Sequence, residues 1–304
     1  MRLTVFAATL LIASPVLAQT PDAAPLVAAE RAFAADAPSM GIAGSFNKWS
    51  VPEAIVIGGG QALRIGDAYP DGPRPAGEPL LEWWPNFAGM SRSGDFGFTT
   101  GGVALNGQRT GHYFTVWRKQ ADGSWKWVYD GGSGASAADV PGPDSEPAIL
   151  PPGPELLRVV REGVPDTGPS ASEWAMTAVR EEEAVLAEIA ASDQKAAHLR
   201  FMADNGRLYV APRPPAIGRD AFAGALDGWP ATFAFGPAES GAASDYGDLV
   251  WTWGPAAWSR DGQARNGHYV RMWQRQEAGW KIVLAQLIPA PPPPPAPPPP
   301  PAGG

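Results

Sequence analysis

The chain has no cysteine among its 304 residues and only three histidines, His112, His198 and His268. The absence of cysteine excludes disulfide bonds, thiol redox chemistry and cysteine-ligated zinc. The histidines lie in different parts of the chain, and no two have the i, i+4 spacing of a helical zinc site. A glycine run at 58–60 lacks the Gly-Lys-Ser/Thr ending of a phosphate loop. We therefore expect no metal site and no cofactor.

Basic residues are fewer than acidic ones: Lys and Arg total 23 and Asp and Glu total 31, a net charge of −8. A negatively charged protein is not attracted non-specifically to nucleic acid or to anionic membranes. Long hydrophobic runs are also missing, since the apolar run Leu3–Ile12 is too short to cross a bilayer. We expect neither a nucleic-acid partner nor a membrane span.

The N-terminus has the three parts of a secretory signal peptide. Arg2 supplies the positive charge, Leu3–Ile12 the short apolar segment, and Val16-Leu17-Ala18 the small-residue cleavage pattern. We predict that residues 1–18 are a signal peptide cleaved after Ala18. The protein is then periplasmic or secreted.

Three sequence blocks of the first half recur, in order, in the second half. The pairs are Gly94–Gly101 with Gly247–Gly254, Arg109–Trp117 with Arg265–Trp273, and Trp125–Val128 with Trp280–Val283. The spacing between the copies changes only at glycine-containing turns, where hairpins tolerate insertions. The blocks are rich in aromatic and β-branched residues, so each set predicts a β-meander.

A helical segment precedes each meander. We expect helix over Leu26–Trp49, broken at Pro38, and over Ser172–Ala203, where Ser170 and Glu173 have capping-box spacing. Short apolar strands follow at 54–57 and 207–210. Helices first and a meander after them indicate an α+β fold.

The repeat and the composition divide the chain into five parts. We predict a signal peptide at 1–18, a first domain at 22–132, a Pro/Gly-rich linker at 133–170, a second domain at 171–288 and a proline-rich tail at 289–304. The tail is expected to be disordered. A segment that docks on a partner is the alternative.

The repeated pattern resembles a known family. Gly-Asp-x-x-x-Thr-x-Gly, a turn, Gly-His-Tyr-x-x-x-Trp, a second turn and Trp-Lys-x-Val are similar to the nuclear transport factor 2-like superfamily, most closely to its SnoaL-like branch with the domain of unknown function 4440. The resemblance implies two copies of a cone-shaped, cystatin-like fold, in which a curved antiparallel sheet wraps around N-terminal helices and encloses an apolar pocket. Members include isomerases, cyclases, dehydratases and proteins of unknown activity.

The resemblance also bears on assembly and chemistry. Single domains of this family pair through their outer sheet faces, so a tandem copy implies a monomeric pseudo-dimer made within one chain. Some members use an acidic base just after the first strand, where this chain has Gly58 and Ala211. Neither residue accepts a proton, so we do not expect isomerase chemistry of that type.

Alternation along the strands nominates a pocket face in each copy. Alternate residues of a strand share a face, and the more apolar faces consist of His112, Phe114 and Val116 in one copy and His268, Val270 and Met272 in the other. We predict that both faces point into the cones and that these six residues contact a ligand. A core histidine satisfied by a backbone carbonyl or a neighbouring Tyr is the alternative.

Two other sets of residues carry weaker signals. Trp83-Trp84 is interpreted as the end of a helix that packs in the core. Asp95 and Asp248 each follow a glycine at the start of a strand, and we interpret both as residues that cap a turn.

The leading functional hypothesis is an exported tandem protein that binds a small apolar ligand in one or both cones. An enzyme of isomerase, cyclase or hydrolase type that uses His112 or His268 is one alternative. A structural or interaction module with filled pockets is the other. The sequence does not decide whether the protein is an enzyme.

Overall fold

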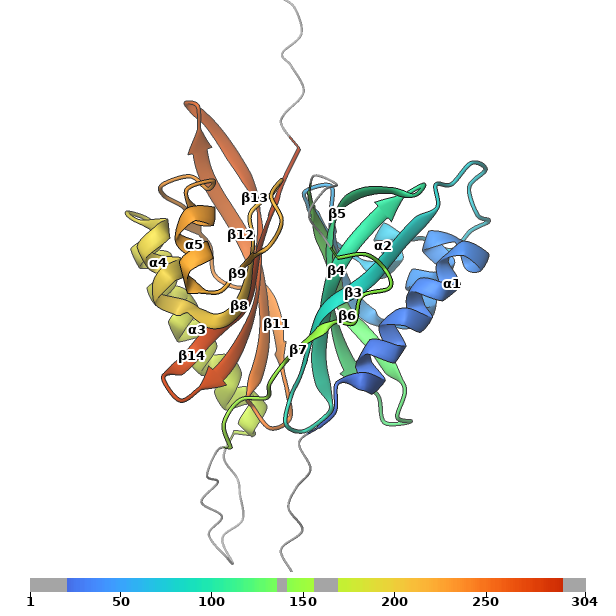
Figure 1. The fold of residues 1–304 in the computed structure, drawn as a ribbon, viewed down its shortest axis with the longest axis horizontal. Helices are drawn as coiled ribbons and strands as arrows, with labels where there is room; N and C mark the ends of the chain where they lie inside the picture. Colours follow the sequence, from blue (N-terminus) through green and yellow to red (C-terminus); the bar gives the residue numbers. More distant parts are fainter. Residues whose placement is uncertain (1–20, 136–140, 156–168, 292–304) are drawn as a thin grey trace, which may run out of the picture.

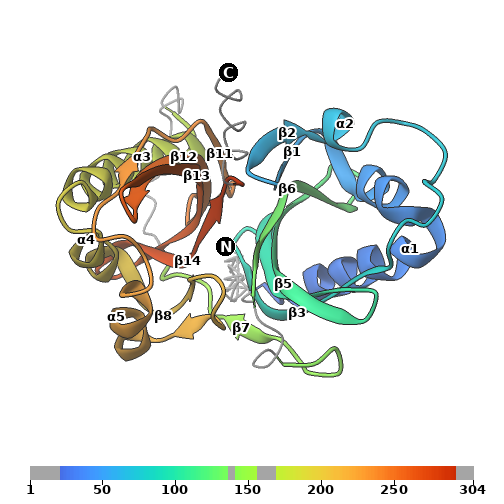
Figure 2. The ribbon, with the colours of Figure 1, turned by 90° about the horizontal axis from the view of Figure 1, so that it is seen from above.

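The computed structural model describes residues 21–135, 141–155 and 169–291. These residues form two α+β units, each built on one seven-stranded sheet. In Figure 1 the two sheets lie next to each other in the middle of the molecule, and helices cover their outer sides. Figure 2 shows each sheet curling around its own helices.

The predicted fold class, two curved sheets wrapped around N-terminal helices and packed as a pseudo-dimer within the chain, is confirmed. The predicted signal peptide and most of the proline-rich tail lie outside the described residues.

The first unit has the strand order β2-β1-β6-β5-β4-β3-β7. β1 runs parallel to β6 and β7 parallel to β3, while the other neighbours are antiparallel. Its elements are α1 (Ala24–Trp49), β1 (Ser50–Gly58), β2 (Gln61–Arg64), α2 (Ile65–Ala68), β3 (Leu81–Met90), β4 (Phe96–Leu105), β5 (Gln108–Lys119), β6 (Trp125–Gly134) and β7 (Ala148–Leu150).

The second unit has the order β10-β12-β13-β14-β8-β9, and β11 also pairs with β12. β8 runs parallel to β14, in the way that β1 runs parallel to β6. Its elements are α3 (Ala171–Ala190), α4 (Gln194–Phe201), β8 (Met202–Tyr209), β9 (Ala216–Ile217), α5 (Arg219–Leu226), β10 (Ala234–Phe235), β11 (Ser240–Ala243), β12 (Leu249–Arg260), β13 (Gln263–Gln276) and β14 (Gly279–Pro289).

Both predicted meanders are confirmed, and their hairpin turns explain the register. Asn106 and Gly107 have φ angles of 51° and 75°, and Asp261 and Gly262 have 52° and 71°. A two-residue turn of type I′ needs positive φ at both positions, which Asn-Gly and Asp-Gly adopt most readily. These turns join β4 to β5 and β12 to β13 as antiparallel hairpins; the second pair keeps one register throughout, and the first shifts once, between Val103 and Ala104.

Helix α1 forms where it was expected, but its break is not at Pro38. Pro38 lies inside the helix, and the non-helical residue is Gly41, with φ of 78°. A Cβ at Gly41 would lie 2.9 Å from Glu78 Oε2, and the same oxygen accepts a hydrogen bond from the backbone N–H of Ile42 at 3.2 Å. The Glu78 carboxylate thus caps the second helical segment, and only glycine leaves it room.

The helix predicted over Ser172–Ala203 is two helices, α3 and α4, rather than one. Its predicted capping box is confirmed, because the Ser170 N–H donates to Glu173 Oε2 at 2.7 Å and the Glu173 N–H donates to Ser170 Oγ at 3.3 Å. Ala203, expected at the helical end, already belongs to strand β8.

Trp83 and Trp84 lie in strand β3, so the prediction of a helix ending there is wrong. β3 pairs with β4 through a register shift between Pro85 and Phe87. Proline donates no hydrogen bond, and such an irregularity accommodates it within a sheet. Trp83 is buried against α1, in the core where tryptophan was expected.

The predicted linker, 133–170, is partly built into the fold. Residues 133–134 still belong to β6, and β7 adds a parallel strand next to β3. The chain then crosses to the second unit, where Gln274 Nε2 donates to the carbonyl of Pro151 at 2.9 Å. Arg92 Nε of the first unit donates to the carbonyl of Gly153 at 2.6 Å. This ordered stretch therefore contacts both units.

The outer faces of the two sheets pack against each other and form the interface. One hydrophobic cluster contains side chains of both sheets, including Phe98, Phe114 and Tyr129 of the first unit and Trp251 and Met272 of the second. The rings of Tyr129 and Trp251 lie 5.1 Å apart. Two further clusters lie between each sheet and its own helices. We call the space between the first sheet and its helices the first cone and the space between the second sheet and its helices the second cone.

Two aspartates make reciprocal contacts across the interface. The Arg92 N–H donates to Asp248 Oδ2 at 3.0 Å, and the Asp245 N–H donates to Asp95 Oδ2 at 3.1 Å. Within their own turns, Asp95 accepts from Ser91 and Asp248 accepts from Ser244. Their predicted turn-capping role is confirmed, and the contact between units follows a two-fold pattern.

Candidate functional site

The predicted pocket faces point at the interface, not into the cones. Phe114, Val116, Val270 and Met272 all belong to the cluster shared by the two sheets. The alternation along β5 and β13 was predicted correctly, but the side was inverted. Both faces of these strands are buried. An apolar face in the sequence indicates that the face is buried, but it does not indicate which part of the protein covers that face.

The opposite faces line the cones. Tyr113 and Trp117 pack with residues of α1, and Tyr269 and Trp273 pack with residues of α3 and α4. From the sequence, these faces are the less apolar ones and were not expected to line the cones. Inside the cones, the indole N–H groups of Trp117 and Trp273 donate to Glu30 and Glu183, and the Tyr269 hydroxyl donates to the carbonyl of Gly236. These hydrogen bonds explain why the inner face is the more polar one.

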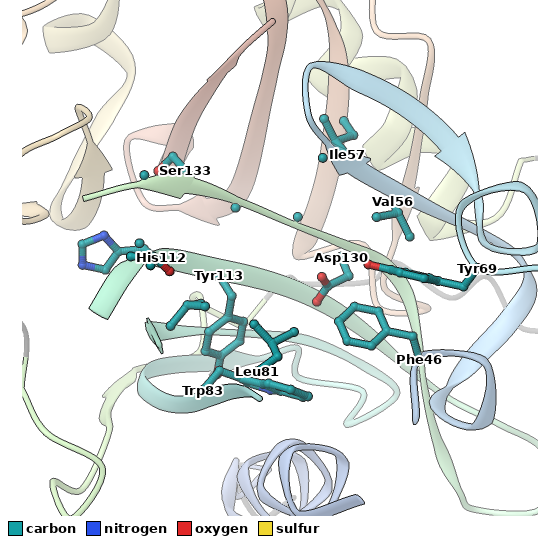
Figure 3. A pocket seen from close by; sticks show the side chains of 17 residues that line it. Phe46, Val56, Ile57, Tyr69, Leu81, Trp83, His112, Tyr113, Asp130 and Ser133 are labelled. Carbon is teal, nitrogen blue, oxygen red and sulfur yellow. The ribbon is translucent and has the colours of Figure 1, made fainter. Parts of the chain in front are cut away.

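His112 is among the residues that line a cavity in the first cone, but its imidazole points toward the second unit. Its ring centroid is 5.1 Å from that of Tyr209 in the second unit, and Figure 3 shows it away from Asp130 and Tyr69. Burial lowers the pKa of His112 to about 4, so the ring is neutral near pH 7. The geometry does not support a pocket histidine that transfers protons.

His268 lies next to Trp253 of the interface cluster and is among the residues that line a second cavity, of about 770 Å³. Its ring packs on Trp253 at 5.6 Å, and burial lowers its pKa. The predicted orientation into a cone is wrong for both histidines. Ligand contact at the six nominated residues stays a prediction: His112 and His268 each lie among residues that line a cavity, and the other four belong to the interface cluster.

The first cone contains a cavity of about 290 Å³. It lies among residues of α1, β1, β3, β5 and β6, and its wall is mainly aromatic and aliphatic (Figure 3). Its lining residues other than glycine are Phe46, Val56, Ile57, Tyr69, Leu81, Trp83, Val103, Thr110, His112, Tyr113, Asp130 and Ser133. Small-molecule sites are mostly apolar with a few placed polar groups, and their volumes start near 300 Å³.

Asp130 is the carboxyl group of this cavity. It lies on β6 opposite Thr115 of β5, whose Oγ1 donates to Asp130 Oδ2 at 2.7 Å. Burial raises the pKa of Asp130 well above its usual range, and the nearby Glu30 raises it further. The carboxyl group is therefore a candidate proton donor or acceptor in an apolar setting.

Tyr113 adds a hydroxyl group with no partner. The residue is 5% exposed, and its Oη has no hydrogen-bond partner within the described ranges. Burial is also the main cause that raises the pKa of Tyr69, followed by the charge of Asp130. Both phenols therefore remain protonated at neutral pH. An unpaired buried donor facing a cavity indicates a ligand group that would accept from it.

Glu30 lies behind the cavity wall and is completely buried. It accepts hydrogen bonds from Trp83 Nε1 at 2.6 Å and Trp117 Nε1 at 3.0 Å, and also from Thr99 Oγ1. Burial raises its pKa to about 7, against the lowering effect of these hydrogen bonds. Our sequence reasoning missed this residue, although it lies one helical turn before Phe33 on the face expected to pack on the sheet.

Glu183 occupies the equivalent place in the second cone. It accepts from Thr252 Oγ1 at 2.7 Å and Trp273 Nε1 at 2.8 Å, as Glu30 accepts from Thr99 and Trp117. It also forms an ion pair with Arg271. Aligning the copies by their repeat would have placed the two glutamates together, and this was the available signal.

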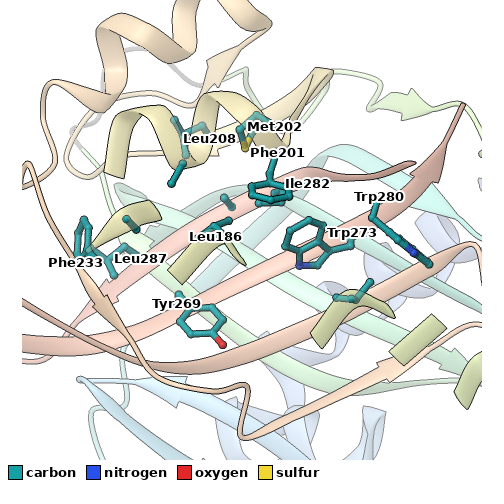
Figure 4. Packing of buried hydrophobic residues seen from close by; sticks show 14 of the residues in the cluster. Leu186, Phe201, Met202, Leu208, Phe233, Tyr269, Trp273, Trp280, Ile282 and Leu287 are labelled. Atoms are coloured by element: carbon teal, nitrogen blue, oxygen red, sulfur yellow. The ribbon is translucent and has the colours of Figure 1, made fainter. Parts of the chain in front are cut away.

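Arg271 is buried in the second cone, at the repeat position that Thr115 holds in the first. The residue is 1% exposed, and its guanidinium lies 4.1 Å from the ring centroid of Tyr269 and 4.4 Å from that of Phe235. Aromatic and aliphatic side chains, including Phe233 and Leu287, occupy the rest of this core (Figure 4).

One pair of facing positions accounts for the difference. Thr115 faces Asp130 in the first sheet, and Arg271 faces Ala285 in the second. The first cone therefore holds two carboxyl groups, Asp130 and Glu30. The second holds one carboxylate with its own cation.

The described residues contain no group of three or more His, Cys, Asp or Glu that could hold a metal ion. Across the same ranges no helix is long and apolar enough to cross a membrane.

No protein-family model matches the sequence, and no curated protein matches it. Solved structures resemble part of the chain. An NTF2-like protein with a cystatin-like fold from Novosphingobium aromaticivorans is 22% identical, with 38% of this chain and 81% of that chain covered and a TM-score of 0.32. An NTF2-like protein of unknown function from Pseudomonas putida is 15% identical, covering 38% and 87%, with a TM-score of 0.33. A ketosteroid isomerase-like protein from Erwinia carotovora atroseptica is 14% identical, covering 38% and 96%, with a TM-score of 0.33. Likenesses at this level say nothing about activity.

Proposed function

We propose that the first unit binds one small, largely apolar molecule in its cone. The observation that carries this proposal is a largely apolar cavity whose wall contains a buried carboxyl group, Asp130, and an unpaired phenol, Tyr113. Apolar walls supply affinity, and a few polar groups set orientation. The ligand is the small apolar molecule expected from the sequence, and its polar contacts are Asp130 and Tyr113 in place of the histidines.

The second unit supports the first as a packing partner. Arg271 and the aromatic side chains around it leave that core filled with the chain's own groups. We therefore expect one ligand molecule per chain.

We further propose that the chain is an exported, monomeric pseudo-dimer that arose by duplication of one SnoaL-like domain. The recurring sequence blocks, the shared element order and the reciprocal contacts of Asp95 and Asp248 support this. Light scattering on the purified chain should give the mass of a single chain. A stable dimer of chains would contradict the proposal, and finding Arg2 on the exported protein would contradict cleavage after Ala18.

Equilibrium dialysis with naphthalene, a neutral apolar probe, tests the binding function. Leu81 lines the cavity. Leu105 is the partner of Leu81 in the β3–β4 pair and is not a lining residue. We expect saturable binding of one naphthalene per chain. Leu81→Trp should weaken it by about tenfold or more, because the indole occupies the cavity. Leu105→Trp adds the same group outside and should leave binding unchanged. Equal effects of the two variants would contradict a site in the first cone.

A proton-transfer enzyme is a second candidate, favoured by the raised pKa of Asp130 in an apolar cavity. Such a carboxylate could remove a proton from carbon next to a ketone and return it. We would measure exchange of these hydrogens for deuterium in a small cyclic ketone by NMR. Loss of exchange in Asp130→Asn, with partial recovery in Asp130→Glu, would establish this activity. Exchange no faster than in buffer would reject it for that substrate class.

A further inference from the structure

The second cone shows what an equivalent site looks like when it is occupied. There, the guanidinium of Arg271 lies over the ring of Tyr269 and pairs with Glu183. The corresponding residues of the first cone are Tyr113 and Glu30, which are present. The position of Arg271 itself is taken by Thr115, which carries no charge and is much shorter.

The first cone consequently has an excess of acid. Asp130 takes the place of Ala285 and adds a second carboxyl group near Glu30. Within the described part of the chain neither carboxyl group has a lysine or arginine partner. Buried charges are usually paired, and an unpaired buried carboxylate is costly.

We propose that the ligand of the first cone carries a planar cationic group, an amidinium or guanidinium, which binds Asp130 and lies against the ring of Tyr113. The ligand's cation would thus complete the charge balance that Arg271 supplies in the second cone. This inference rests on the proposed ligand-binding function and specifies the chemical class of the ligand.

The surrounding groups suit such a cation. A delocalised cation is weakly hydrated, pairs with a carboxylate through parallel N–H donors and stacks on aromatic faces. Phe46, Tyr69, Trp83 and Tyr113 supply aromatic surface around Asp130 in the cavity. Burial raises the pKa of Asp130, which favours the protonated carboxyl group when no ligand is bound. Binding of a cation should therefore release a proton from Asp130.

The test uses three probes of the same shape and different charge: benzamidine, benzamide and benzoate. Their affinities for the purified full chain are measured by calorimetry or ligand-observed NMR. We expect benzamidine to bind at least about tenfold more tightly than benzamide, and benzoate to bind most weakly. Calorimetry in buffers of different ionisation enthalpy should show proton release with benzamidine only.

Two variants locate the preference. Asp130→Asn should lower benzamidine affinity to that of benzamide and leave benzamide binding in place. Asp122→Asn removes the same charge from the exposed turn of the same hairpin and should change nothing. Thr115→Arg, which copies the second cone, should block benzamidine even if Asp130→Asn does not fold.

The outcomes separate this inference from the proposed function. Equal affinities for benzamidine and benzamide, or an unchanged ratio in Asp130→Asn, overturn the cationic ligand even when naphthalene binds. Binding of benzamidine that depends on Asp130, without binding of naphthalene, retains the cation and rejects an apolar ligand. No binding of any of the four probes overturns both.

Discussion

Replacing Glu183 by Gln should destabilise the chain far more than replacing Glu30 by Gln, although the two residues occupy equivalent places. Arg271 is 1% exposed, and Glu183 is its ion-pair partner. Without the carboxylate, a buried guanidinium remains unpaired, which costs about 3–5 kcal/mol. Glu30→Gln removes no counterion. It replaces one acceptor oxygen by a donor group and should cost about 1–2 kcal/mol.

The two penalties should also differ in their pH dependence. Burial raises the pKa of Glu30 from 4.5 to about 7, so the folded chain binds this proton more tightly than the unfolded chain. Stability from Glu30 is then present below about pH 4.5 and lost as pH rises to about 7, a loss of about 3 kcal/mol. Gln does not ionise, so the penalty of Glu30→Gln should shrink or reverse near pH 8. The penalty of Glu183→Gln should persist, since a guanidinium stays charged over this range.

Urea unfolding followed by tryptophan fluorescence near pH 5 and near pH 8 measures both effects. The control is the double variant Glu183→Gln/Arg271→Met, which should recover most of the lost stability because no charge remains buried. Equal losses for Glu183→Gln and Glu30→Gln near pH 8 would refute the assignment of Arg271 as the decisive difference. No recovery in the double variant would refute the unpaired guanidinium as the cause.

Three further predictions concern the histidine, the interface and a helix cap. The imidazole resonances of His112 should not titrate between about pH 5 and 8 in NMR spectra, because burial lowers its pKa to about 4; a midpoint near 6.5 would contradict its buried position. Asp248→Ala should lower the free energy of unfolding, measured in urea, by about 1–3 kcal/mol and Asp95→Ala by less, since Asp248 is 1% exposed and both bind across the interface; the reverse order would contradict this. Ser170→Ala should cost about 1 kcal/mol through loss of the capping box, with Ser170→Asp expected to retain the stability.

The elements that could be predicted from the sequence are those with local signals. The hairpin turn at Asn106-Gly107 and the cap at Ser170 depend on a few adjacent residues, and the structure has both. The helix break was misplaced because Gly41 is stabilised by Glu78, which is distant in sequence. The strand containing Trp83 was missed because tryptophans with an adjacent proline give no clear period.

The candidate site could not be predicted because it depends on which side of a sheet faces which partner. The alternation of Phe114 and Tyr113 defines two faces, and a chain that packs sheet on sheet buries both. Asp130 becomes a cavity residue only through its pairing with Thr115 and the burial of that strand. In sequence it precedes a glycine run and resembles an ordinary polar residue at the edge of a loop.

Joining two such domains in one chain frees each from the other's sequence. In a dimer of identical subunits, an arginine at the position of Thr115 would enter both cones at once, and every subunit would lose its cavity. Here Thr115 and Arg271 are encoded separately, so one half can accumulate changes for rigidity while the other retains a cavity and a buried acid. Residues at the interface, such as Tyr129 and Trp251, remain constrained by each other. Diversification within this protein should therefore be concentrated inside the cones, and the surface between the halves should change slowly.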